Sequence, residues 1–207
     1  MNRLSMTAAV LGLGISLGTA QAREAYTIKD TSFRDEFGQR VQQLVLDVDA
    51  SPAEVWKALT TDEGIKRWAA PIAHVDLMNG GMWESSYSLS SHIGDRENIR
   101  NQIIAYVPGR LLVFHNVHVP KGAPPDFALL PAIRTILQIE PLGHGRARVT
   151  QSGVGYGEGA GFDGLYAHFN AGNRFVFEGL AKALTGKPVD WQAEADKAKA
   201  SVGDKSK

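Results

Sequence analysis

The stretch Phe162–Leu184, FDGLYAHFNAGNRFVFEGLAKAL, predicts one long helix. Its apolar residues recur at gaps of three, four and seven, so they form one stripe along a helix: Phe162, Leu165, Tyr166, Phe169, Val176, Phe177, Leu180 and Leu184. Gly186 and Pro188 follow, as is typical of a helix end. The helix would be about 34 Å long. Because the residues before it mostly alternate like strands, we expect this helix to pack against a curved antiparallel sheet.

The region before the helix predicts the order of the other elements. Val41–Val48 alternates as a half-buried strand, and Ser51-Pro52-Ala53-Glu54 has the pattern of a capping box that begins a helix over Pro52–Leu59. A second short helix begins at Thr61 or Asp62. Further strands are expected over residues 72–77, 82–89, 98–107, 111–119, 133–139 and 147–153. The predicted fold is therefore α+β: about seven antiparallel strands, two short helices after the first strand, and a long C-terminal helix.

The first 22 residues have the three parts of a secretory signal peptide. Arg3 supplies the positive charge, Ala8–Leu17 forms an uncharged and mostly apolar core, and Ala20-Gln21-Ala22 is a small-x-small cleavage site. This core is too short to span a bilayer comfortably, and no later apolar run is long enough. We therefore expect a periplasmic or secreted protein without an integral membrane span once the signal is removed.

The remaining chain divides into a loosely held lead-in (23–40), a single domain (41–188) and a polar tail (189–207) that we expect to be disordered. The 22 basic and 22 acidic residues balance, and there is no basic run, so we expect no nucleic-acid partner. The absence of cysteine excludes disulfides and thiolate metal sites. The chain also lacks the motifs of phosphate-binding loops and nucleophile elbows, and we expect no cofactor.

Five short motifs together resemble those of a known superfamily: Ala50–Thr60 (ASPAEVWKALT), Ile65–Trp68 (IKRW), Gly80–Trp83 (GGMW), Val107–Leu111 (VPGRL) and Gln151–Gly153 (QSG). With the predicted order of elements, the chain resembles the SRPBCC superfamily of START-type, birch-pollen-allergen-like proteins with a helix-grip fold. Within it, the chain looks most similar to the family related to the activator of heat-shock protein 90 ATPase, and to polyketide-cyclase-like relatives. This resemblance implies a cavity between sheet and helix for an apolar or amphipathic small molecule. It implies no shared catalytic motif.

Nine residues are candidates for the lining of that cavity. The apolar walls would come from Trp68, Trp83, Tyr87, Phe114, Tyr166 and Phe169, and the polar anchors from Asn116, His118 and Asn173. Tyr87 shares its strand parity with Trp83, and Asn116 and His118 share theirs with Phe114. Asn173 lies near the apolar stripe of the long helix, where a pocket role and a structural role are equally open.

Two further features bear on the chemistry. His115 and His118 have opposite strand parity, so one regular strand cannot aim both at one metal ion, and we expect no metal site. A structural role is the alternative for His118. The segment Pro120–Pro131 holds four prolines and a glycine, and predicts a long irregular loop of the kind that often borders a binding site.

The favoured function is the binding of a small hydrophobic or amphipathic molecule by an exported protein. An alternative is a cyclase- or hydrolase-like enzyme of the same fold, with His118 or Glu84 as its acid–base group. A second alternative is a protein-interaction module with an exposed apolar surface, which a pocket filled by its own side chains would favour.

Overall fold

The computed structural model describes residues 25–204, so the expected signal peptide lies outside the described residues. The strands are β1 (Tyr26–Asp30), β2 (Phe33–Arg34), β3 (Arg40–Val48), β4 (Ile72–Val75), β5 (Met82–Ser86), β6 (Ile99–Val107), β7 (Leu111–His118), β8 (Arg134–Gly143) and β9 (Arg146–Tyr156). The helices are α1 (Pro52–Thr60), α2 (Asp62–Lys66), the 3₁₀ helix η1 (Pro125–Ala132), α3 (Ala160–Leu184) and α4 (Trp191–Asp204).

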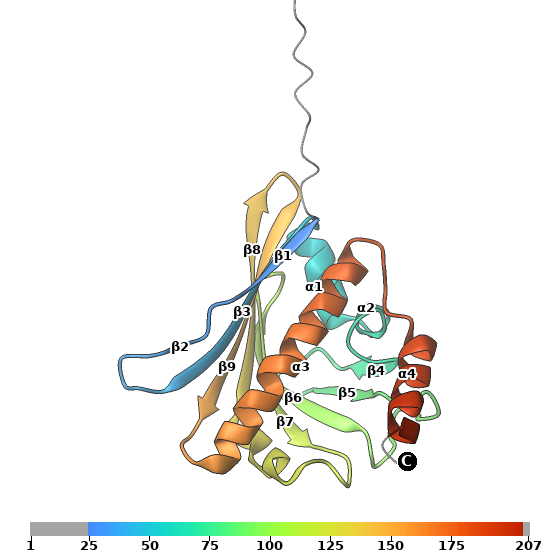
Figure 1. Cartoon of the computed structure of the whole chain (residues 1–207). Helices are drawn as coiled ribbons and strands as arrows, with labels where there is room; N and C mark the ends of the chain where they lie inside the picture. Colours follow the sequence, from blue (N-terminus) through green and yellow to red (C-terminus); the bar gives the residue numbers. More distant parts are fainter. Residues whose placement is uncertain (1–24, 205–207) are drawn as a thin grey trace, which may run out of the picture.

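All strands belong to one antiparallel sheet in the order β1-β3-β9-β8-β7-β6-β5-β4, with β2 also paired to β3. The sheet curves around α3, which crosses its concave face (Figure 1). The α+β helix-grip prediction is thus confirmed. The sheet has nine strands rather than about seven because the lead-in is not loosely held. Tyr26 and Ile28 alternate opposite Val48 and Leu46 and pack against the core, so this segment pairs as β1.

The two short helices begin where the sequence predicts. The Ser51 side chain accepts a hydrogen bond from the Glu54 backbone N–H, and the Glu54 carboxylate accepts one from the Ser51 N–H at 2.7 Å. This reciprocal pair satisfies two free donors at the start of α1. Thr61 caps α2, since its hydroxyl accepts from the Gly64 N–H at 3.0 Å. The two helices then bury Val55, Leu59 and Ile65 against the sheet.

Helix α3 is held at its two ends by two separate apolar clusters. Toward its C-terminus, Phe177 and Leu180 pack into the main core under the sheet. Toward its N-terminus, Leu165 packs with Tyr156 of β9 and with Leu130 of η1. The middle of the helix therefore stands over the sheet between two clusters, and this arrangement leaves room for a cavity.

The C-terminal segment differs from the sequence expectation, because the tail expected to be disordered forms helix α4. Val189 donates its backbone N–H to the Arg67 carbonyl (2.9 Å), and the Trp191 indole Nε1–H donates to the Lys66 carbonyl (2.5 Å). These bonds tie the start of α4 to the end of α2. The single aromatic residue of the segment, Trp191, thus anchors a helix whose other residues are mostly small or charged.

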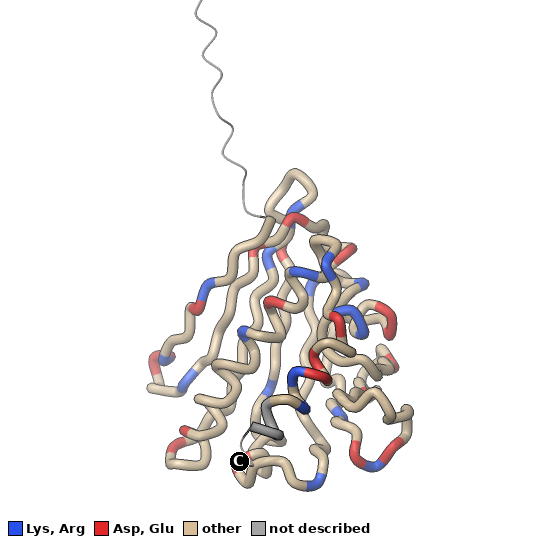
Figure 2. Tube along the Cα trace, turned by 45° about the vertical axis from the view of Figure 1, so that its right-hand side comes forward, with Lys and Arg blue, Asp and Glu red and all other residues tan. Residues whose placement is uncertain are grey.

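Acidic and basic residues are interspersed along the described part of the chain rather than gathered in one patch (Figure 2). No helix among residues 25–204 combines the length and the apolar character needed to cross a membrane.

Candidate functional site

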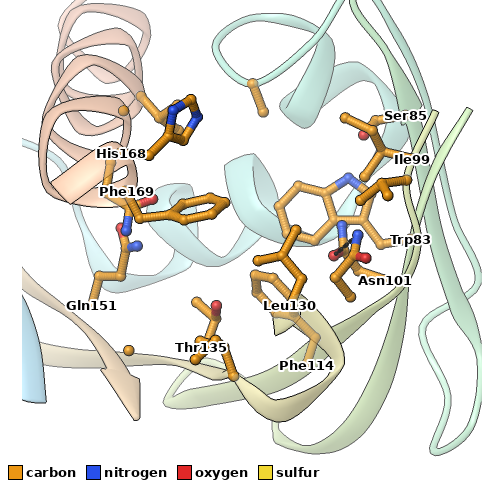
Figure 3. Close-up of a pocket in the computed structure, with 18 of the residues that line it drawn as sticks. Trp83, Ser85, Ile99, Asn101, Phe114, Leu130, Thr135, Gln151, His168 and Phe169 are labelled. Carbon is orange, nitrogen blue, oxygen red and sulfur yellow. Dashed lines mark hydrogen bonds between the residues drawn. The ribbon is translucent and has the colours of Figure 1, made fainter. Parts of the chain in front are cut away.

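A cavity of about 430 Å³ lies between the concave face of the sheet and the middle of α3. Its walls come from five adjacent strands, β5 to β9, from α3, and from η1 with the loop before it. Figure 3 shows Phe169 pointing from α3 toward Trp83 across this space, with Leu130 and Phe114 between them. The site is therefore enclosed by the same two elements that define the fold.

Aromatic rings form one wall of the cavity. Trp83 packs edge-on against Phe114, with ring centroids 5.1 Å apart, and against Trp68 at 6.2 Å. The indole of Trp68 is fixed in turn, because its Nε1–H donates to the Ala58 carbonyl at 2.9 Å. Rings packed in this way have few alternative positions, so this wall presents a preformed apolar surface.

Seven of the nine candidate residues line the cavity: Trp68, Trp83, Tyr87, Phe114, Asn116, Phe169 and Asn173. Tyr87 lies at the rim and is 58% exposed. Asn173 has both of the roles that the sequence left open, since it lines the cavity while its Nδ2 donates to Gln42 Oε1 at 2.7 Å. The same Gln42 oxygen accepts from the Tyr156 hydroxyl at 3.2 Å. Burial raises the pKa of the Tyr156 phenol, which therefore stays protonated as a donor.

The prediction that His118 lines the cavity is wrong, and a β-bulge explains the error. Asn116 pairs with Asn101, whereas His118 pairs with the next residue, Arg100, so Val117 is an extra residue on β7. One extra residue reverses the faces of the residues that follow it. His118 consequently turns to the outer face, where its Nε2 lies 2.7 Å from the Arg96 carbonyl, and Val119 lines the cavity instead.

Tyr166 does not line the cavity either. It lies on the side of α3 that faces β3, one turn before the open region, and its ring packs edge-on against Tyr156 at 5.0 Å. The guanidinium of Arg40 covers its other side, 5.4 Å from the ring centroid. Tyr166 therefore belongs to the apolar cluster that holds the N-terminal end of α3, which the helical stripe alone does not distinguish from the cavity wall.

Glu84 is placed as a structural residue rather than as an acid–base group. Its neighbours Trp83 and Ser85 line the cavity, so Glu84 lies on the opposite face of β5. There its Oε1 accepts hydrogen bonds from the Gly94 N–H (2.7 Å) and from Asn98 Nδ2 (2.6 Å). The carboxylate thus closes the loop between β5 and β6.

The sequence analysis missed a set of polar residues that line the cavity: Ser85, Asn101, Thr135, Gln151 and His168. Parity gives a signal for the strand residues, because Gln151 continues the inward row of Ala147 and Val149, and Ser85 continues that of Trp83. His168 gives no such signal. It is a polar residue outside the apolar stripe of α3, and it lines the cavity beside Phe127 of η1, with the two ring centroids 4.8 Å apart.

The loop rich in proline borders the cavity, as expected. It is not irregular throughout, because residues 125–131 belong to η1, and Pro120, Phe127 and Leu130 contribute to the lining. Two glycines of α3 make room for η1, since Leu129 and Asp126 occupy the space that a Cβ would need at Gly161 and Gly164. This part of α3 is therefore fitted closely to η1.

Gly172 lies on the cavity side of α3, and a Cβ built there would meet no atom within 4 Å. Glycine in a helix interior costs roughly 1 kcal/mol relative to alanine. Because no neighbouring group requires the glycine, its local effect is to leave the cavity wider at the middle of the helix.

Comparison with solved structures shows the same fold in three bacterial proteins. The Aha1 dimer from Colwellia psychrerythraea is 18% identical over 70% of this chain and 95% of its own, with a TM-score of 0.53. CalU16 from Micromonospora echinospora is 17% identical over 84% and 93%, with a TM-score of 0.52. MLL2253 from Mesorhizobium loti is 17% identical over 71% and 99%, with a TM-score of 0.54. At these identities the likeness concerns the fold alone.

A search of curated proteins found no match. The family model described as "Activator of Hsp90 ATPase homolog 1-like protein" matches residues 49–185, which run from just after β3 to the end of α3 and include every element that lines the cavity. This chain belongs to the family of proteins like activator of Hsp90 ATPase homolog 1.

Proposed function

We propose that this protein is exported and binds a small hydrophobic or amphipathic molecule in the cavity between the sheet and α3. The observation that carries the proposal is the cavity itself: about 430 Å³, within the range of small-molecule sites, with aromatic walls and a few polar groups. The support for export is the signal-like pattern of residues 1–22.

The two alternatives receive less support. The enzyme hypothesis relied on His118 or Glu84, and neither side chain lines the cavity. A general acid or base must lie within hydrogen-bond reach of the substrate, directly or through one water. A pocket filled by its own side chains would favour the interaction-module hypothesis, whereas the space between α3 and the sheet is open.

Native mass spectrometry of the protein purified from its own host's periplasm tests the proposal. We expect a polypeptide that begins at Arg23, with an additional mass that disappears on denaturation. The matched variants are Gly172→Phe, whose ring would fill the open middle of the cavity, and Gly172→Ala, which leaves most of it free. The additional mass should be absent from Gly172→Phe and present in Gly172→Ala.

Two results would contradict the proposal. If the wild-type protein carries no additional mass and also fails to bind an apolar fluorescent probe, the cavity is not a binding site. If the protein is found in neither the periplasm nor the medium, or if the chain recovered there retains residues 1–22, the export part of the proposal is wrong.

A further inference from the structure

Several polar side chains face the cavity without a partner in the protein. Gln151 and Ser85 are each only 9% exposed, yet neither the Gln151 amide nor the Ser85 hydroxyl makes a hydrogen bond within residues 25–204. The Thr135 hydroxyl and the Asn101 amide nitrogen also lack partners within that range. Buried polar groups are nearly always hydrogen-bonded. The polar atoms of these four side chains are accessible from the cavity, so water or a bound molecule there supplies their partners.

The strand register explains why these groups point inward. Gln151 lies between Leu44 and Leu137, which are directly opposite it on the neighbouring strands and are both buried in the core. An apolar residue at position 151 would continue that packing. An amide at this position, with no partner in the protein, has a clear use only if a molecule in the cavity hydrogen-bonds to it.

These polar groups lie on opposite sides of an apolar centre. Gln151 is on β9, while Ser85 is on β5 and Asn101 on β6, and Figure 3 shows them on the two sides of Phe169, Leu130 and Phe114. Four strand spacings separate β5 from β9, or about 19 Å along the curved sheet and less across the cavity. A molecule that reaches both sides needs an elongated apolar body.

The lining carries no formal charge. Among the described residues that line the cavity there is no Asp, Glu, Lys or Arg, and His168 is the single imidazole. A charged ligand group would lose its hydration here without gaining an ion pair, which is strongly unfavourable. Amide and hydroxyl groups, in contrast, suit uncharged hydroxyl and carbonyl groups.

From these observations we propose that the ligand is an uncharged, elongated molecule with an aromatic or otherwise apolar centre and hydroxyl or carbonyl groups at both ends. Gln151 binds one end, and Ser85 with Asn101 binds the other. This inference rests on the proposed function and specifies its ligand.

Three probes with one carbon skeleton test the inference: trans-stilbene, its 4,4′-dihydroxy derivative and its 4,4′-dicarboxylate. Binding to the mature protein is measured at neutral pH by titration calorimetry and by the quenching of tryptophan fluorescence. We expect the diol to bind about tenfold more tightly than stilbene, because the protein's polar groups then gain partners, and we expect the dicarboxylate to bind most weakly.

The variants Gln151→Leu and Ser85→Ala remove one polar end each. Each variant should weaken binding of the diol by about tenfold and leave stilbene binding equal or stronger. Because the two positions lie on different strands, one variant remains informative if the other fails to fold.

The outcomes separate the two proposals. If stilbene and the diol bind equally, or if both variants bind the diol as the wild-type protein does, the cavity binds ligands but the inference about their class is overturned. Tight binding of the dicarboxylate would overturn it as well. If none of the three probes binds, the result contradicts the proposed function itself.

Discussion

The rings of Tyr87 and Trp191 pack edge to face, with centroids 6.4 Å apart and an angle of 62° between their planes. Tyr87 belongs to the rim of the cavity, and Trp191 is the first residue of α4. The C-terminal helix is therefore anchored directly at the rim of the candidate binding site, through one aromatic contact and the hydrogen bond from Trp191 to Lys66.

This contact predicts that Trp191 controls exchange of the cavity's contents. Trp191→Ala removes both the ring contact and the Nε1–H donor, so α4 should detach and a bound stilbene probe should dissociate several-fold faster in stopped-flow measurements. Limited proteolysis should cleave the segment after Leu184 more readily. Gln192→Ala is the matched control, because Gln192 is exposed and bonds only within α4. Equal dissociation rates in both variants would show that α4 has no part in exchange.

Gly172 predicts a gain in stability on substitution. Gly172→Ala should raise the free energy of unfolding by about 0.5–1 kcal/mol, measured by urea denaturation, because alanine favours the helix and its methyl group meets no neighbour. Gly64→Ala is the control within α2, where a Cβ would collide with the Lys57 carbonyl, and it should destabilise the protein. A destabilised Gly172→Ala variant would indicate that the space at Gly172 is not open.

The hydrogen bonds of Glu84 predict that its substitution lowers the stability of the fold without weakening ligand binding in the cavity. In Glu84→Gln, the two donors from Gly94 and Asn98 would meet an amide in place of a carboxylate. The free energy of unfolding should fall by about 1–3 kcal/mol, while the affinity for a stilbene probe stays within twofold of the wild-type value. Loss of a catalytic turnover in a stable Glu84→Gln protein would instead restore the enzyme hypothesis.

The pair His74–Asp62 predicts a pH-dependent contribution to stability. His74 Nδ1 lies 2.9 Å from Asp62 Oδ2, and this hydrogen bond raises the pKa of His74 above 6.5. Burial raises the pKa of Asp62, but the hydrogen bonds from His74 and from the Val75 N–H outweigh it and lower the pKa below 3.8.

The directions of these two pKa shifts define the pH range in which the pair stabilises the fold. The contribution of His74 to the free energy of unfolding is complete below pH 6.5, and it disappears as the pH rises through the raised pKa of the folded state. The contribution of Asp62 is complete above pH 3.8, and it disappears as the pH falls through the lowered pKa of the folded state. The difference in unfolding free energy between wild type and His74→Gln should be largest near pH 5 and decrease above neutral pH. Asp62→Asn should remove the same pH-dependent part, and a difference that grows with alkaline pH would contradict the pairing.

Periodicity and capping signals in the sequence predicted the sheet, α1, α2 and α3, because each depends on residues close together in the chain. Tyr26 and Ile28 alternate as well, but the segment is too short and polar to be recognised before its partner Val48 is known. The errors at His118 and Tyr166 have a different origin. A single extra residue, Val117, reverses the face of His118, and the position of Tyr156 determines what Tyr166 contacts.

The residues that line the cavity also divide into those that the sequence pattern identifies and those that only the structure reveals. Trp83, Phe114 and Phe169 were predictable as inward-facing apolar residues, whereas His168 lies outside the apolar stripe of α3 and lines the cavity beside Phe127 of η1. Parity could have identified Gln151, but a glutamine in an inward row is usually taken as an interruption of that row. The structure is needed to show that its amide lacks a protein partner.

The two apolar clusters that hold α3 have one further consequence. The helix is held at both ends, and most of its own residues in the two clusters, such as Leu165 and Leu180, do not line the cavity. Mutations at Gly172, Thr135 or Gln151 can therefore accumulate without loosening the supports. The residues that shape the cavity can therefore change while the contacts that hold the helix against the sheet are kept.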